Sequence, residues 1–214
     1  MNGIHDMGGM GGFGKVDPQD DEGFHEDWER QVRAIISLVR VGGVDEFRFT
    51  IESLPPVDYL SLGYFGRWLL AREKMLVKYG LITEEELKNP EGRLARTAGY
   101  QAVTPEQAGT RTSRSKRMQL DVPPRFQVGD RVRVKNEHPR GHTRHPRYVR
   151  GHRGQVHIDH GVFPFPDRVA HGLEDKPQHC YAVKFTATEL WGSRGNARDI
   201  VYLDLFDDYL EAAS

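Results

Sequence analysis

The sequence has very little cysteine and no long hydrophobic run. Cys180 is its one cysteine, which excludes an internal disulfide and any thiolate-rich zinc or iron–sulfur site built by this chain alone. A membrane helix needs about 18 or more consecutive apolar residues, and no such stretch occurs. The first sixteen residues carry glycines and an acid where a secretory signal needs a basic start and an apolar stretch. We therefore expect a folded, cytoplasmic protein with a reduced cysteine.

The chain also has no large excess of positive or negative charge. The formal net charge is −1, so no overall electrostatic attraction draws the chain to nucleic acid. The charge is nevertheless uneven, because residues 17–29 are acidic and residues 111–153 are basic. With 214 residues and 37% hydrophobic content, the chain can bury a core in one large domain or in two small ones.

Local patterns predict a helical N-terminal half. Residues 1–24 are rich in glycine and acids, which favours an extended arm. Residues 25–92 carry apolar residues at helical spacing, which indicates a helical domain. The expected helices are a first at Trp28–Val39, ended by Gly42-Gly43; a second capped by Asp45 and stopped by Pro55-Pro56; a long third from Tyr59 to Gly80; and a short fourth opened by a Thr83–Glu86 capping box.

The C-terminal half predicts strands. Residues 93–122 are polar and basic, a composition typical of a linker. From 123 to 214 the apolar period changes to two, and alternation occurs at 126–134, 151–158, 180–185 and 200–205. Short strands at this spacing favour a small antiparallel β-barrel, because closure leaves no exposed edge. The predicted fold class is therefore α+β: an extended arm and a helical domain, followed by a small barrel.

A glycine-rich run in the arm matches the letters of a dinucleotide-binding loop. Gly9 to Gly14 spell Gly-Met-Gly-Gly-Phe-Gly. Such a loop binds phosphate only between a buried strand and the N-terminus of a helix, and neither flank is present. We interpret the run as part of a flexible arm.

Histidines are concentrated in the basic region. Eight lie between His138 and His179, and His138 and His142 have the i, i+4 spacing of a helical metal pair. Pro139 and Gly141 disfavour a helix there, and no cysteine or carboxylate stands at ligand spacing. We interpret these histidines as loop and strand-surface residues. No Ser/His/Asp or Cys/His arrangement of a nucleophilic enzyme is recognisable.

Two arginine environments are unusual. The segment Gly141–Gly151 holds three arginines and two histidines, and an arginine fork can hold a carboxylate, phosphate or oxidised sulfur oxygen with two bonds. A solvated basic loop is the simpler interpretation. Arg48 lies in a helix beside Phe47 and Phe49, where it either pairs, if buried, or extends its charge to water. Taken alone, the residues favour a solvated basic loop for the Gly141–Gly151 segment and a guanidinium that reaches water for Arg48.

A series of motifs along nearly the whole chain resembles the β subunit of nitrile hydratase. The opening Met-Asn-Gly-Ile-His-Asp-Met-Gly-Gly is similar to the N-terminal arm of that family. The later landmarks follow in order: Asp45-Glu46-Phe47-Arg48, Gly141-His142-Thr143-Arg144 with Arg147-Tyr148 and Arg150-Gly151, Phe163-Pro164 with Pro166-Asp167, Glu189-Leu190-Trp191-Gly192, and Asp204–Glu211.

The resemblance implies an enzyme shared between two subunits. The family hydrates nitriles to amides at a low-spin cobalt(III) or iron(III) ion that the α subunit holds through cysteine sulfurs, two of them oxidised, and backbone amides. This chain would bind no metal itself, and the Gly-His-Thr-Arg sequence of the loop favours cobalt. Expected partners are the α subunit, in an αβ pair or an α2β2 heterotetramer, and a small nitrile. Neither nucleic acid nor a membrane is expected as a partner.

Site residues follow from the same resemblance. Two β-subunit arginines hydrogen-bond the oxidised cysteines in the family, and by motif they correspond to Arg48 and Arg144. Tyr64 matches a tyrosine of the substrate pocket, with Trp68 one turn further along, although an i, i+4 aromatic pair is also typical of plain core packing. Relatives often carry aromatic or apolar residues before the Arg48 helix, where this chain has Arg33 and a shorter connection.

Two other classes of function stay open at this stage. A small barrel with a Val-Gly-Asp turn and basic loops also resembles ribosomal SH3-like domains, which would make the chain a nucleic-acid-binding module; the acidic helical half argues against it. A non-catalytic accessory or metal-delivery homologue is the other alternative. A neighbouring reading frame without the cysteine loop of the α subunit would favour it.

Overall fold

The computed structural model describes residues 3–19, 23–89, 103–104, 107 and 116–213. The chain divides into two compact units: a helical unit of Gly3–His5 and Gly11–Ser113, and a β unit of Met1–Asn2, Asp6–Met10 and Arg114–Ser214. The N-terminal residues are thus divided between the two units. In the segments that the structure describes, no helix is long and apolar enough to cross a membrane.

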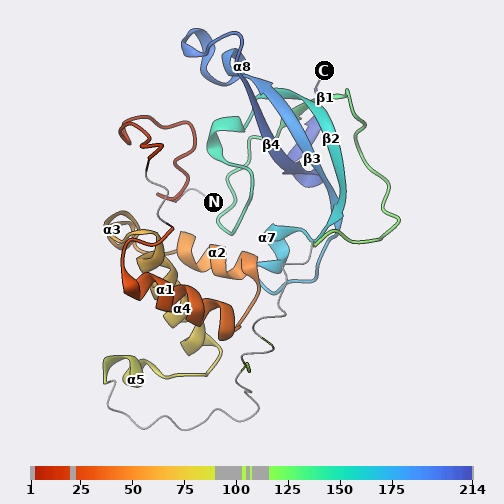
Figure 1. The fold of residues 1–214 in the computed structure, drawn as a ribbon. Helices are drawn as coiled ribbons and strands as arrows, with labels where there is room; N and C mark the ends of the chain where they lie inside the picture. Colours follow the sequence, from red (N-terminus) through yellow and green to blue (C-terminus); the bar gives the residue numbers. More distant parts are fainter. Residues whose placement is uncertain (1–2, 20–22, 90–102, 105–106, 108–115, 214) are drawn as a thin grey trace. The chain divides into compact units, whose positions relative to one another are not determined.

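The helical unit is built around one long helix. Its elements are α1 (Asp27–Leu38), α2 (Val44–Glu52), α3 (Pro56–Ser61), α4 (Tyr64–Lys78) and α5 (Glu84–Lys88) (Figure 1). α4 packs against α1 and α2. The buried cluster of this unit consists of Val41, Phe47, Ala71 and Met75. Its members come from α2, α4 and the connection before α2, so the apolar stripes predicted for these helices do face a core.

The predicted helix boundaries differ from the structure at three points. The expected single helix from Tyr59 to Gly80 is two helices, because Leu62 and Gly63 adopt extended backbone (ψ 136° and 178°) and Gly63 becomes the N-cap of α4. Pro56 begins α3 rather than only ending the helix before it, as its fixed φ suits a first helical turn. Gly43, not Asp45, is the N-cap of α2.

Two predicted termini are confirmed. Gly80 follows α4 with φ +67°, a left-handed conformation that glycine adopts without steric cost. The capping box is present: the Thr83 hydroxyl accepts from the Glu86 backbone N–H at 3.2 Å, and Glu86 Oε2 accepts from the Thr83 backbone N–H at 2.7 Å.

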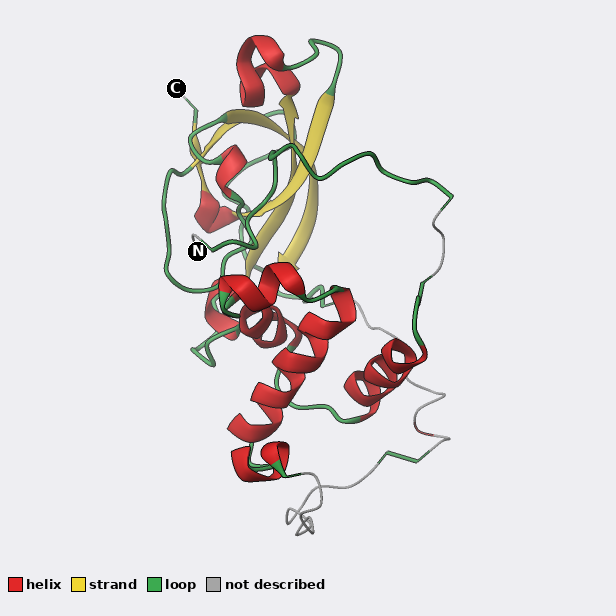
Figure 2. Ribbon diagram, turned by 90° about the vertical axis from the view of Figure 1, so that its left-hand side faces the viewer, coloured by secondary structure: helices red, strands yellow, loops and turns green. Residues whose placement is uncertain are grey.

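The β unit contains an antiparallel sheet in the order β4-β3-β2-β1-β5. Its strands are β1 (Arg131–Val134), β2 (Arg153–Phe163), β3 (Gln178–Thr186), β4 (Ile200–Phe206) and β5 (Leu210–Ala212), shown in yellow in Figure 2. Short helical turns lie between them: η1 (Arg147–Val149), α7 (Pro166–Val169), α8 (Ala187–Trp191), η2 (Gly192–Arg194) and η3 (Asp207–Tyr209). The four alternating segments of the sequence all contribute strands. The first begins only at Arg131, because Gln127–Asp130 forms a turn around Gly129 (φ +100°).

The described sheet is not closed, so the expected barrel is not observed. Its edges are β4 and β5, which pair with β3 and β1 and not with each other. η3 carries the chain directly from the end of β4 to β5 at the opposite edge. The pairing of β2 with β3 has two register shifts, and such irregularities bend a sheet. The bent sheet covers a core although its edge strands do not pair with each other. The innermost side chains of that core include Val132, Tyr181, Val183, Leu205 and Leu210.

Candidate functional site

Arg48 lies in α2 of the helical unit and is paired within its own helix. Its Nη1 lies 2.9 Å from Asp45 Oδ1, with the Arg48 side chain 46% exposed and the Asp45 side chain 7% exposed. The buried carboxylate therefore holds a half-exposed guanidinium, which combines the two alternatives that the sequence left open. Among the described residues the recorded pairing uses Nη1 alone, so donors of the fork stay available to an external anion.

Tyr64 and Trp68 are brought together on one face of α4. Their ring centroids lie 4.9 Å apart. Trp68 also meets the buried Phe47 edge-to-face at 5.5 Å, so it belongs to the packing around the helical core, whereas Tyr64 is 57% exposed. Phe47 directly precedes Arg48 in α2, so the aromatic cluster contacts the residue before the arginine.

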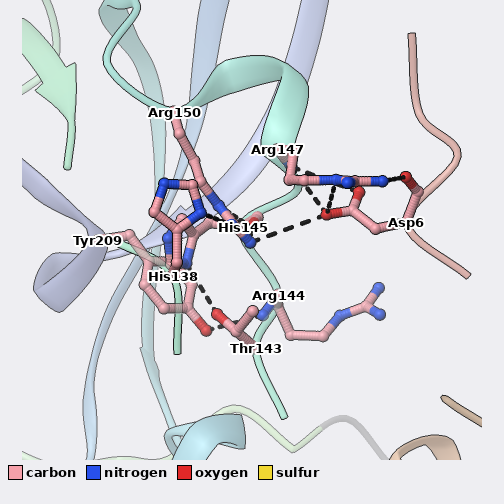
Figure 3. A network of polar contacts seen from close by, with 8 residues as sticks. All are labelled: Asp6, His138, Thr143, Arg144, His145, Arg147, Arg150 and Tyr209. Atoms are coloured by element: carbon pink, nitrogen blue, oxygen red, sulfur yellow. Dashed lines mark hydrogen bonds and ion pairs between the residues drawn. The ribbon is translucent and has the colours of Figure 1, made fainter. Parts of the chain in front are cut away.

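Arg144 lies in the loop before η1 of the β unit, and a buried tyrosine holds its backbone. The Arg144 backbone N–H donates to Tyr209 Oη at 3.0 Å (Figure 3). Tyr209 in turn donates to the Asp167 carboxylate. Burial and Asp167 raise the pKa of Tyr209 well above its ordinary value, so the phenol stays protonated. The exposed Arg144 side chain extends away from this network, and among the described residues no partner is recorded for its guanidinium.

The interpretation of the histidines as loop and strand-surface residues misses the burial of three of them. His142 and His145 lie in the loop but are buried, and His179 is buried on β3. The His145 ring packs against the Tyr209 ring with centroids 4.4 Å apart and planes tilted by 39°, and its Nδ1 lies 2.8 Å from Thr143 Oγ1. Burial, reinforced by the positive charge of Arg150, lowers the pKa of His145 to about 4. The ring next to Arg144 is therefore neutral at pH 7 and supports the loop by packing.

Asp6 and Arg150 are site residues that sequence reasoning missed. Asp6 accepts a hydrogen bond from the Arg147 backbone N–H at 3.0 Å, and its carboxylate lies 3.8 Å from Arg150 Nη2. Burial lowers the pKa of Arg150, and the negative charge of Asp6 opposes that shift. One signal was available: Asp6 is the only acid among the first sixteen residues.

The described residues do not fit a metal site. In the described part of the chain no group of three or more histidine, cysteine, aspartate or glutamate side chains is placed to hold an ion. The one thiol is also unsuited, because burial, with the charges of Asp204 and Asp159, raises the pKa of Cys180 to about 12. A metal ligand has to be the thiolate. The residues present instead offer two arginines and an aromatic face.

These features define the class of protein. It is an α+β chain with a helical unit that carries Arg48 and an antiparallel β unit that carries Arg144. Family models for the two domains of the nitrile hydratase β subunit match it, the N-terminal one over residues 1–118 and the C-terminal one over residues 115–212. The chain belongs to the nitrile hydratase β-subunit family.

Relatives match along nearly their whole length. "Nitrile hydratase subunit beta" of Pseudomonas putida is 38% identical and the match covers 100% of both chains. "Cobalt-containing nitrile hydratase subunit beta" of Pseudonocardia thermophila is 37% identical over 99% of this chain and 96% of the relative. "Low-molecular weight cobalt-containing nitrile hydratase subunit beta" of Rhodococcus rhodochrous is 35% identical over 98% and 99%.

Proposed function

We propose that this chain is the β subunit of a nitrile hydratase and hydrates nitriles to amides together with an α subunit. The observation that carries the proposal is the full-length match: both domain models of the family are present in order, and a curated β subunit aligns over 100% of both chains. We propose an αβ pair, joined into an α2β2 heterotetramer and working in the cytoplasm.

The metal of this enzyme belongs, in our proposal, to the α subunit. Two relatives are named as cobalt-containing, which favours cobalt(III) over iron(III). The ion supplies Lewis-acid activation of the nitrile. This chain contributes no ligand and instead lends side chains to the partner's centre.

Arg48 and Arg144 are the side chains we assign to that centre, as donors to the oxidised cysteine oxygens of α. Sulfinate and sulfenate groups held away from water need charge-assisted donors. The geometry suits this role, because Arg144 extends an exposed guanidinium from a fixed backbone and Arg48 is held by Asp45 through one nitrogen. Tyr64, with Trp68 behind it, supplies the β-subunit wall of the substrate pocket.

Co-expression with the adjacent reading frame tests the function. The two chains should co-purify, and the complex should convert a small nitrile to its amide, followed by liquid chromatography. The chain alone should bind no cobalt or iron by elemental analysis. A complex that forms yet makes no amide would support an accessory or metal-delivery role instead.

Arg48→Lys and Arg144→Lys in the assembled complex test the assignment of residues. Each should lower kcat by at least about 100-fold, because an ammonium cannot reproduce the two-bond fork and loss of one oxyanion-type donor costs about that much. Two controls should stay near the wild-type rate. Arg140→Lys is exposed in the same loop region, and Arg30→Lys has an i, i+3 spacing to Asp27 on α1 like that of Arg48 to Asp45. Gel filtration checks assembly. Near-normal turnover in both lysine variants would refute the assignment.

A further inference from the structure

The N-terminal arm carries a buried carboxylate into the basic loop. Within the β unit the Asp6 side chain is 7% exposed and lies between Arg147 and Arg150 (Figure 3). Its Oδ2 is 3.0 Å from the Arg147 backbone nitrogen, 3.4 Å from Arg147 Nε and 3.8 Å from Arg150 Nη2. The Asp6 carbonyl oxygen also accepts from Arg147 Nη2 at 2.8 Å. One acid therefore engages both arginines that follow Arg144.

Two glycines after Asp6, Gly8 and Gly9, let the arm approach the loop closely. A Cβ on Gly8 would lie 2.6 Å from ring carbons of Tyr148, and one on Gly9 would lie 3.0 Å from Tyr148 Cβ and 3.3 Å from Trp191 Nε1. Gly9 also has φ +75°, a conformation that side chains other than glycine rarely adopt. The approach of the arm thus depends on the absence of side chains at these two positions. This gives the Met-Gly-Gly part of the N-terminal motif a physical reason.

Arg150 transmits the contact to the backbone beside Arg144. The Arg150 side chain is 2% exposed, and it donates to the His145 carbonyl oxygen from Nη2 at 3.0 Å and from Nε at 3.3 Å. Its Nη1 lies 2.9 Å from His138 Nδ1. A buried guanidinium needs negative charge close by, and Asp6 supplies it. His145 is the residue after Arg144, so the position of Arg150 sets the path of the loop at Arg144.

We propose that Asp6 is a positioning residue that acts through Arg150 and the His145 carbonyl to fix Arg144. The inference rests on the role of Arg144 proposed above. It gives the N-terminal arm a part in the reaction, since the arm determines where the exposed guanidinium points. Asp6 itself touches neither substrate nor the partner's oxidised cysteines in this scheme.

A double-mutant cycle tests the proposal in the assembled complex. Asp6→Asn keeps the size of the side chain and removes its charge. It should lower kcat about tenfold or more, because a misplacement of about 1 Å can cost about 100-fold. In an Arg144→Lys background the same change should cost less than about twofold, because the group that Asp6 positions is already gone. Equal fold losses in both backgrounds would indicate a general structural role and overturn the proposal.

Hydrogen exchange of the full chain gives a readout that does not use activity. Asp6→Asn should speed amide exchange about tenfold in a peptide covering residues 141–151, because loosening the loop lowers the free energy of local opening. Asp17→Asn is the matched control: it is the next acid of the arm, is exposed, and accepts a bond only from nearby Gln19 among the recorded contacts. It should change neither exchange nor kcat. Unchanged exchange in Asp6→Asn would contradict the mechanism.

The outcomes separate this proposal from the one on which it rests. If Arg144→Lys is slow and Asp6→Asn is normal, only the role of Asp6 fails. If Arg144→Lys is normal, the role of Arg144 fails and the role of Asp6 fails with it. If Asp6→Asn does not assemble, Asp6→Glu replaces it, since glutamate keeps the charge but shifts it by one methylene. A loss in Asp6→Glu that persists undiminished beside Arg144→Lys would again refute the proposal.

Discussion

His179 shows how single contacts set the charge of a buried side chain. Its Nδ1 lies 2.9 Å from both Asp159 carboxylate oxygens, and its Nε2 lies 2.7 Å from the Val122 carbonyl oxygen. An ionised carboxylate and a carbonyl only accept hydrogen bonds, so this arrangement favours the imidazolium, in which both ring nitrogens donate. Burial lowers the pKa of His179, but the bonds to Asp159 and Val122 and the charges of Asp159 and Asp207 raise it further than burial lowers it.

This charge predicts a loss of stability in mildly alkaline solution. The folded pKa lies above the unfolded value of about 6.5, so the stabilisation is fully present below about pH 6.5 and is lost as the pH rises through the folded pKa. In urea unfolding of the full chain, the difference in unfolding free energy between the wild type and His179→Gln should shrink from about pH 6 to about pH 8.5. His157→Gln, at an exposed position of the neighbouring strand β2, is the control for replacing a histidine by glutamine. A constant difference for His179→Gln would rule out the imidazolium.

Sequence motifs could nominate site residues, but they could not give the environments of those residues. Arg48 and Arg144 were singled out only through the resemblance to a family, because each local pattern alone favoured a simpler interpretation. The burial of His179 could not, since its partner Val122 lies 57 residues away. Asp6 is separated from Arg147 by 141 residues, so no local spacing connects the arm to the loop. Such contacts arise only when the sheet brings distant segments together.

At the scale of elements, the pairing of β2 with β3 depends on one glycine. A Cβ on Gly154 of β2 would lie 2.6 Å from Val183 Cγ1 and 2.9 Å from both the Lys184 carbonyl oxygen and Phe185 Cε1. All three atoms belong to β3. The side chains of Val183 and Phe185 are fully buried, so neither can move aside without repacking the core.

Gly154→Ala should therefore destabilise the sheet. We expect a decrease of about 1–3 kcal/mol in the free energy of unfolding, the usual cost of overpacking a core, measured as a lower denaturant midpoint. Gly23→Ala is the control, because its Cβ would meet no atom within 4 Å, and its effect should stay below about 1 kcal/mol. Equal effects of the two substitutions would contradict the close approach of the strands.

Element types followed from the sequence more faithfully than element ends. Periods of 3.6 and 2 located the helices and strands because each element buries one face. The break at Leu62-Gly63 was missed, since apolar residues continue at helical spacing across it. Closure of the sheet was also wrongly expected: covering edges is a general tendency, whereas the actual edges are set by η3, a turn that leads β4 directly into β5.

At the scale of the whole molecule, the described residues form two cores that share no member. Val41, Phe47, Ala71 and Met75 form the helical cluster, whereas the cluster of the β unit is formed by residues from Phe126 onward. The three tryptophans divide in the same way, with Trp28 and Trp68 in the helical unit and Trp191 in the β unit. Separate cores need not unfold together, since chains of more than one domain often depart from two-state behaviour.

We expect two unfolding transitions in the full chain, each sensitive to its own core. Met75→Ala and Leu205→Ala remove fully buried side chains from the helical and β clusters, and each should cost about 2–5 kcal/mol. In a Trp191→Phe background, fluorescence reports only Trp28 and Trp68, so Met75→Ala should lower the midpoint seen by fluorescence and Leu205→Ala should leave it unchanged. Circular dichroism, which follows both units, should show the second transition move with Leu205→Ala. A single transition that both substitutions shift alike would mean that the two cores unfold as one cooperative body.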